Sequence, residues 1–135
     1  MGFFKELFGK REVPRDKPMF SMQCNLHPYR LQSFTSGTVD LDIEVSNKFS
    51  KDVLTSIVVR VPKTIGFEQS ALSQQREIRL GFLQAGETKK LRVSLYGTQR
   101  TKPGDYKVNI YAIAHYRDYS YVLNETKKTL ELRAV

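Results

Sequence analysis

Tryptophan is absent from the 135-residue chain, and cysteine and histidine are scarce, with one Cys and two His. A lone thiol, Cys24, cannot close a disulfide within the chain, and this fits a reducing compartment. Cys24, His27 and His115 do not show the spacing of metal ligands. We therefore expect no internal disulfide, no metal and no cofactor.

Long apolar runs and catalytic motifs are missing as well. No apolar run approaches the roughly 20 residues that span a bilayer, and the N-terminus lacks the apolar core and cleavage site of a signal peptide. The sequence contains no GxGxxG, GxxxxGKS/T, HExxH or GxSxG pattern, so the common phosphate-binding and nucleophile motifs are excluded. We expect a cytoplasmic protein that is not an enzyme.

Basic residues outnumber acidic ones, with 22 Lys and Arg against 14 Asp and Glu and a net charge of +8. Such an excess favours an acidic partner, such as nucleic acid or an anionic membrane. The basic residues are spread from Lys5 to Arg133 and gather only in short pairs. That distribution is typical of a solvated surface that also protects sheet edges. Charge alone therefore does not identify the partner.

Residues 1–11, MGFFKELFGKR, show the one helical pattern in the chain. Apolar residues fall on one helical face and charged residues on the other. The apolar residues are Phe3, Phe4, Leu7 and Phe8. A helix this short needs a surface to pack on, so it docks on the domain or is disordered, or it binds a membrane or partner. Residues 10–18 have the charge and prolines of a linker. We expect a helix and linker over 1–18 and one domain over 19–135.

Apolar residues at alternate positions organise the stretch from Leu80 to Ile113. Such alternation puts one set of side chains on one sheet face and predicts half-buried strands. The apolar positions are Leu91, Val93 and Leu95, followed by Tyr106, Val108, Ile110 and Ala112. Turn signals precede both runs, at residues 85–87 (AGE) and 101–105 (TKPGD). Two strands are predicted here.

The clearest strand signal follows Gly37. Apolar residues predicted to point inward alternate with acidic residues predicted to point outward. These are Val39, Leu41, Ile43 and Val45, alternating with Asp40, Asp42 and Glu44. Carboxylates on one strand face point in parallel, whereas calcium needs about six converging oxygens. We expect instead that residues 38–46 pair with residues 88–96, so that Lys90 and Arg92 face the acidic row.

Weaker signals divide the rest of the chain. Residues 19–24 and 29–34 are predicted as short strands separated by His27-Pro28. Residues 53–62 are apolar on both faces, which indicates a central strand ended by Pro62. We also expect a short edge strand over 63–67, a short strand ending at Gly81, and a return strand within 121–135.

Seven or eight short strands without an interior helix predict an all-β fold, an antiparallel β-sandwich. Four segments follow one another in a recognisable order. They are residues 45–47 (VSN), Leu54 with residues 57–62 (IVVRVP), residues 83–87 (LQAGE) and residues 103–108 (PGDYKV). This order resembles immunoglobulin-like domains of the archaeal and bacterial cell-adhesion-related type, and more weakly arrestin-like sandwiches, over residues 37–113. The resemblance implies an immunoglobulin-like fold and no particular ligand.

Tyr106 has a structural role in this resemblance. It follows a tight turn at the start of a strand, where a tyrosine corner places the hydroxyl on nearby backbone. The chain has neither a Cys pair nor a Trp, so it differs from antibody-type domains.

The best candidate for a binding surface is the predicted hairpin tip at residues 115–121, HYRDYSY, with the strand leading into it. Tyr and Arg are enriched at binding hot spots because they add contact area with little loss of entropy. The candidate residues are Tyr111, Ile113, His115, Tyr116, Arg117, Tyr119 and Tyr121. In the competing interpretation, several of these rings pack on neighbours and leave only Arg117 and Asp118 free.

The sequence thus predicts a protein-interaction module with an unknown protein partner, peripheral to a membrane if the N-terminal helix is an anchor. Two alternatives stay open. One is a basic nucleic-acid-binding accessory protein, in which rings stack on bases beside Lys and Arg. The other is a homo-oligomeric structural protein that assembles through an exposed edge strand or the Phe-rich helix.

Overall fold

A computed structural model of the chain describes residues 18–28 and 30–135. Within these residues it contains nine strands and no helix. The strands are β1 (Phe20–His27), β2 (Arg30–Leu31), β3 (Thr38–Asn47), β4 (Val53–Arg60), β5 (Ile65–Gly66), β6 (Gln75–Leu83), β7 (Thr88–Gly97), β8 (Gly104–His115) and β9 (Val122–Ala134). The expected N-terminal helix, with Phe3, Phe4, Leu7 and Phe8, lies outside the described residues.

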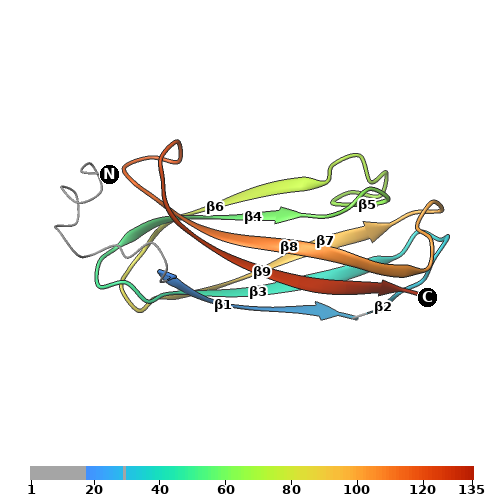
Figure 1. Ribbon diagram of the computed structural model, residues 1–135, viewed down its shortest axis with the longest axis horizontal. Coiled ribbons are helices and arrows are strands. Elements are labelled where there is room, and N and C mark those ends of the chain that lie inside the picture. Colours follow the sequence, from blue (N-terminus) through green and yellow to red (C-terminus); the bar gives the residue numbers. More distant parts are fainter. Residues whose placement is uncertain (1–17, 29) are drawn as a thin grey trace.

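The strands form two sheets that pack as a sandwich, as predicted (Figure 1). One sheet has the order β1-β3-β7-β5 and the other the order β2-β9-β8-β4-β6. The described strands number nine rather than seven or eight because β2 and β5, with two residues each, count as strands. The pairs are antiparallel except for β2 with β9, which run parallel. The expectation of a wholly antiparallel sandwich is wrong at this one short pair.

The core lies between the sheets, on the faces that the alternating residues predict. Leu41 of β3, Val93 of β7 and Ile110 of β8 expose 0%, 2% and 0% of their surface. On β4 nearly every residue is buried, because it lies between β8 and β6 within its sheet. The predicted central position of this strand is confirmed.

The outward face of β3 carries the predicted charge ladder. Asp42 lies opposite Arg92, and Glu44 opposite Lys90. Arg92 Nε donates to Asp42 Oδ1 at 2.7 Å, and Arg92 Nη1 lies 3.7 Å from Asp40 Oδ2. The hydrogen bond from Arg92 lowers the pKa of Asp42. These cross-strand pairs hold β3 and β7 in register.

The strand containing Ile78 does not end at Gly81, contrary to the prediction. β6 continues to Leu83, and its register with β4 shifts between Thr55 and Ser56. Gly81 has a φ of +74°, which glycine adopts without steric cost. The glycine therefore marks a β-bulge inside a longer strand.

The two ends of the sandwich differ. The β8–β9 hairpin lies at one end with the β3–β4 and β6–β7 turns, and β5 lies at the opposite end with the β7–β8 turn (Figure 1). The long strands run between these two ends and connect both sets of loops.

Tyr106 provides a test of the tyrosine corner. Its hydroxyl donates to the carbonyl of Lys102 at 2.7 Å, as expected. Tyr106→Phe should lower the free energy of unfolding by about 1 kcal/mol, because one hydrogen bond is lost without a cavity. Denaturant unfolding measures this change. Tyr96→Phe on β7 is the control, and an equal loss in both variants would contradict a special role for Tyr106.

Candidate functional site

The outer face of the five-stranded sheet holds two aligned rows of side chains. Strand register places Glu77, Val58, Tyr111 and Lys127 across β6, β4, β8 and β9 in one row. The next row contains Arg79, Ser56, Ile113 and Glu125. We call these two rows, together with the adjacent Arg60, the Tyr111 face. Each row has charged residues at its ends and less polar residues in the middle.

Tyr111 lies at the centre of this face. The Arg60 guanidinium carbon lies 5.3 Å from the centroid of its ring, and Lys127 Nζ lies 5.7 Å from it. Both cations are within the range of a cation–π contact. Arg60 is further oriented by Gln75, whose Oε1 accepts a bond from Arg60 Nε at 2.9 Å. Tyr111 and Ile113 are half-buried, and Val58 is 8% exposed. The centre is thus largely apolar, and one of its two cations, Arg60, is oriented by a hydrogen bond.

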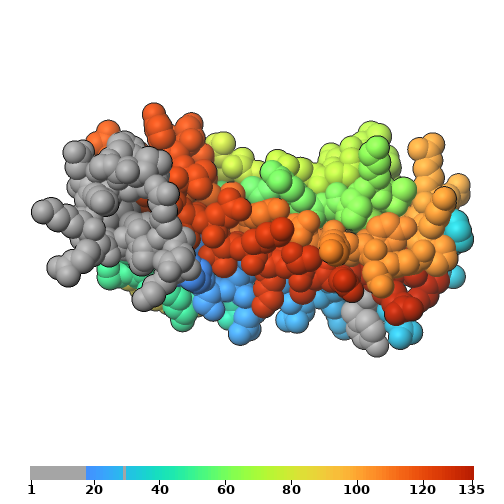
Figure 2. Space-filling view, viewed as in Figure 1, coloured from blue at the N-terminus to red at the C-terminus, as the bar shows by residue number. Residues whose placement is uncertain are grey.

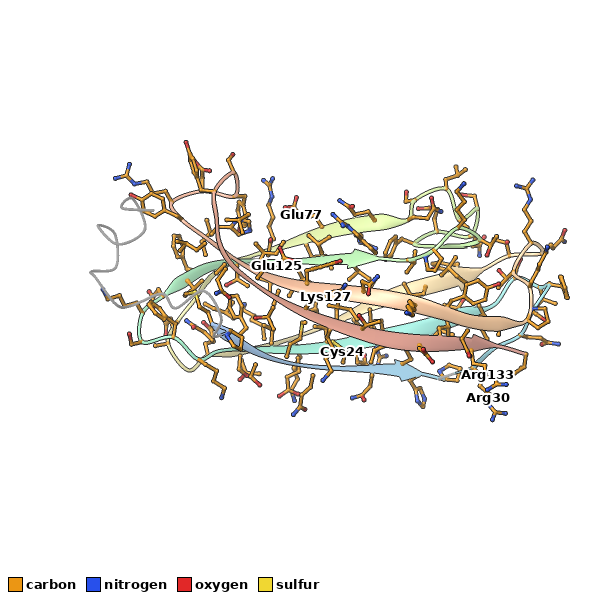
Figure 3. All side chains as sticks on the ribbon, viewed as in Figure 1. Cys24, Arg30, Glu77, Glu125, Lys127 and Arg133 are labelled. Atoms are coloured by element: carbon orange, nitrogen blue, oxygen red, sulfur yellow. The ribbon has the colours of Figure 1, made fainter. Side chains whose placement is uncertain are left out.

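Charges of both signs frame the centre. Arg79 Nε lies 3.4 Å from Glu77 Oε1 along β6, and on β9 Glu125 and Lys127 point to the same face. Glu77, Glu125 and Lys127 are labelled over this sheet in Figure 3. An aromatic centre inside a charged rim is the arrangement of many protein–protein contact surfaces.

The hairpin tip is folded back against this face. Tyr116 and His115 are buried, Tyr119 is half-buried, and Arg117 and Tyr121 are exposed. The amide of Gly81 donates to the Tyr119 hydroxyl at 3.0 Å, and the Arg79 guanidinium carbon lies 4.5 Å from the Tyr119 ring centroid. The bulge in β6 therefore provides the docking point for the tip.

His115 also holds the hairpin tip in place. Its Nδ1 lies 3.2 Å from the Tyr121 carbonyl, its Nε2 lies 2.7 Å from Ser56 Oγ, and its ring packs edge-on against Tyr119 at 5.0 Å. A carbonyl can only accept, so Nδ1 carries the proton and Nε2 accepts from the Ser56 hydroxyl. Burial lowers the pKa of His115, which favours this neutral form.

A hydroxyl bonded to an imidazole also resembles a nucleophile and its base. Ser56 is 0% exposed and His115 is 5% exposed. A substrate therefore cannot reach the hydroxyl in this conformation, and the geometry explains the pair as a support of the hairpin.

The sequence identified only part of this site. Tyr111 and Ile113 point outward as predicted. Arg60, Glu77 and Lys127 were missed, because they come from three other strands and meet only through strand register. The apolar Val58 on the outward face of a central strand was the available signal.

Within residues 18–28 and 30–135, no group of three His, Cys, Asp or Glu side chains is placed to hold a metal ion. Nor does this part of the chain contain a helix long and apolar enough to cross a membrane.

The buried His115 predicts a pH dependence of stability. Its pKa is lowered in the folded state, so between pH 7 and 5 the unfolded chain binds the proton more readily. Stability should therefore fall as the pH falls through this range, by at most about 1.4 kcal/mol per pH unit for this one group. Denaturant unfolding at each pH should show that the free energy of unfolding changes less steeply with pH in His115→Gln than in the wild type. Equal slopes in the two proteins would contradict the assignment.

No protein-family model and no curated protein matches the sequence. Solved structures do share its fold. Alpha-2-macroglobulin from Escherichia coli, in a structure spanning domain MG7 to the C-terminus, is similar with a TM-score of 0.64 and 11% identity over 90% of this chain. The similar region is 17% of that chain, so this protein spans less than a fifth of it.

Two further structures are similar over nearly their whole length. A FixG-related protein from Vibrio parahaemolyticus has a TM-score of 0.56 and 11% identity, covering 87% of this chain and 98% of that one. The CARDB domain of a Pyrococcus furiosus protein, in complex with di-metal ions, has a TM-score of 0.51 and 16% identity, covering 91% and 93%. At these identities the likeness concerns the fold alone, and that fold is an immunoglobulin-like β-sandwich.

Proposed function

We propose that this chain is a protein-interaction module that binds a partner protein through the Tyr111 face. The observation that carries the proposal is the position of Tyr111, half-buried between Arg60 and Lys127 at the centre of a charged rim. Tyr and Arg at the centre of a contact surface are the residues most often found as hot spots. Because their side chains are already held by neighbours, little conformational entropy is lost on binding.

The charges indicate the chemistry of the partner. Arg60, Arg79 and Lys127 surround the aromatic centre and would pair with carboxylates, while Glu77 and Glu125 would pair with cations. We infer a partner surface with an apolar side chain that packs on Tyr111 and Ile113 and with charges of both signs around it. The net charge of +8 favours partners with more acidic than basic groups.

Nucleic acid fits this face less well. Glu77 and Glu125 stand in the same rows as the cations, so a polyanion would meet two carboxylates beside the central ring. The nucleic-acid alternative therefore rests on net charge, and the homo-oligomer alternative rests on the sheet edges. Both stay predictions.

The remaining parts of the proposal concern the hairpin and the N-terminus. We propose that Arg117 and Tyr121 extend the rim of the Tyr111 face, while His115, Tyr116 and Tyr119 support it. Residues 1–11 are proposed as an amphipathic anchor that keeps a cytoplasmic protein peripheral to a membrane. The cell-adhesion-related resemblance supports an interaction role in general and does not select a partner.

Loss of the central contact should weaken partner binding. Tyr111→Ala with Lys127→Ala removes the ring and one of its cations, and hot-spot truncation of this kind weakens Kd by about tenfold or more. Affinity capture from a cell extract with quantitative mass spectrometry should show proteins that bind the wild type and are lost with this variant. Titration of the captured protein then gives the change in Kd.

A matched control removes the same residue types from the other sheet. Tyr96→Ala with Lys90→Ala lies on the outward side of β7 and should retain the partner. Thermal unfolding of both variants shows whether they are folded. A set of captured proteins that is the same for the two variants would contradict the Tyr111 face as the binding surface.

The proposed anchor is tested separately. The 135-residue protein should float with liposomes of mixed neutral and anionic lipids, and a variant without residues 1–11 should remain in the soluble fraction. A variant with Phe3, Phe4, Leu7 and Phe8 changed to Ser keeps the length and charge, and it should also fail to float. Unchanged flotation of the shortened protein would contradict the anchor and leave the Tyr111 face unaffected.

A further inference from the structure

A pocket of about 770 Å³ lies at the end of the sandwich opposite the β8–β9 hairpin. Residues 63–74, around β5 and the loop that follows it, form one wall, and residues 98–100 of the β7–β8 turn form the other. Figure 2 shows a notch at this end between the green segment and the orange turn. The size falls within the range of pockets that hold small molecules.

Buried hydrogen bonds fix the two walls relative to each other. Thr101 is 0% exposed. Its hydroxyl donates to the carbonyl of Thr64 at 2.8 Å and accepts from the amide of Thr98 at 2.8 Å. Gln74 Nε2 donates to the carbonyls of Ala71 and Ile65 at 2.6 and 3.3 Å. Specific hydrogen bonds therefore fix the shape of the pocket walls.

Two residues of the pocket have backbone conformations that are rare for their type. Thr64 has a φ of +74° and Ala71 a φ of +52°. Positive φ is unfavourable for a residue with a Cβ and most of all for a β-branched one. At Gly66 the chain approaches so closely that a Cβ would lie 2.3 Å from Ala71 Cα. Strain of this kind gathers where a fold maintains a binding or catalytic geometry.

The hydroxyl of Thr64 lacks a partner. Its oxygen is buried and makes no hydrogen bond with any residue in the described part of the chain. A buried hydroxyl without a partner costs about 1–3 kcal/mol. Like the positive φ of the same residue, this unpaired hydroxyl is an unfavourable feature that the fold maintains at the pocket wall.

The charge of the pocket is positive. Lys63 and Arg100 line it, and none of the described residues that line it is acidic. Glu68, the acid of the nearby loop, instead accepts from the amide of Ser73 at 2.6 Å, which lowers its pKa. Hydroxyls and amides make up most of the remaining lining, including those of Ser36, Ser70 and Thr98. Carboxylates that would hold a divalent cation are missing from this lining.

The geometry points to a second binding site in this pocket, which takes a small anion that also carries hydroxyl groups, of the class of the phosphorylated sugars. Lys63 and Arg100 bind the phosphate by charge-assisted hydrogen bonds. Ser70 and Thr98 bind the hydroxyls, and Ala71 and Leu72 contact the carbon skeleton. The site lies at the far end from the β8–β9 hairpin and shares no lining residue with the Tyr111 face.

Nuclear magnetic resonance titration of the full chain tests this inference. Glucose 6-phosphate and ribose 5-phosphate, added to millimolar concentrations, should produce saturable shifts in the amides of Thr64, Ala71 and Thr98. Lys63→Gln with Arg100→Gln should weaken this binding by about tenfold or more. Ser70→Ala removes an exposed hydroxyl of the lining, and it should weaken binding severalfold.

Controls test the contributions of the pocket charges, the sugar hydroxyls and the phosphate separately. Lys48→Gln with Lys89→Gln removes two charges at the other end of the sandwich and should leave binding unchanged. Glucose and inorganic phosphate should each bind more weakly than the sugar phosphates. The inference is overturned if neither sugar phosphate shifts these amides, if the two charge variants weaken binding equally, or if inorganic phosphate alone binds as tightly.

Discussion

One buried asparagine joins the two sheets at the hairpin end. Asn47 is 0% exposed, and its Nδ2 donates to the carbonyls of Lys51 and Leu83 at 2.9 and 3.0 Å. Its backbone carbonyl accepts from Gly86 at 2.9 Å, and its amide donates to the carbonyl of Glu87 at 2.9 Å. A residue at the end of β3 thus holds the β3–β4 turn, the end of β6 and the β6–β7 turn together. Because buried backbone groups must be paired, this network fixes where strands of opposite sheets leave the core at the hairpin end.

At both ends of the sandwich, buried polar side chains hold the loops in place by hydrogen bonds, but the resulting shapes differ. At the hairpin end, Ser56, His115 and Tyr119 satisfy one another and the bulge at Gly81, so the tip lies closed on its sheet. At the other end, Thr101 fixes the walls but leaves a hollow between them. The closed tip therefore borders the Tyr111 face, which lies on the long strands of the same sheet. The opposite end keeps an open pocket between its two walls.

The sequence allowed the fold to be predicted better than the site. Alternation predicted the inward faces of β3, β7 and β8, and opposite charges predicted the pairing of Asp42 with Arg92. The bulge at Gly81 could not be foreseen, because a glycine ends a strand as readily as it interrupts one. Tyr111 and Ile113 were recognised from their own strand. Arg60 and Lys127 were not, because their place beside Tyr111 depends on the register of two other pairings. The Thr64 pocket has no local signal, since its strain arises from tertiary contacts.

The position of Cys24 determines how the only thiol of the chain behaves. It points into the core from β1, is 6% exposed, and burial raises its pKa to about 11. The reactive thiolate is therefore scarce at neutral pH, and oxidants or alkylating agents cannot approach the sulfur while β1 remains paired with β3. The rate at which this sulfur reacts therefore depends on how often the edge strand β1 separates from β3. Oxidation would then occur mainly in molecules in which β1 has already separated from its sheet.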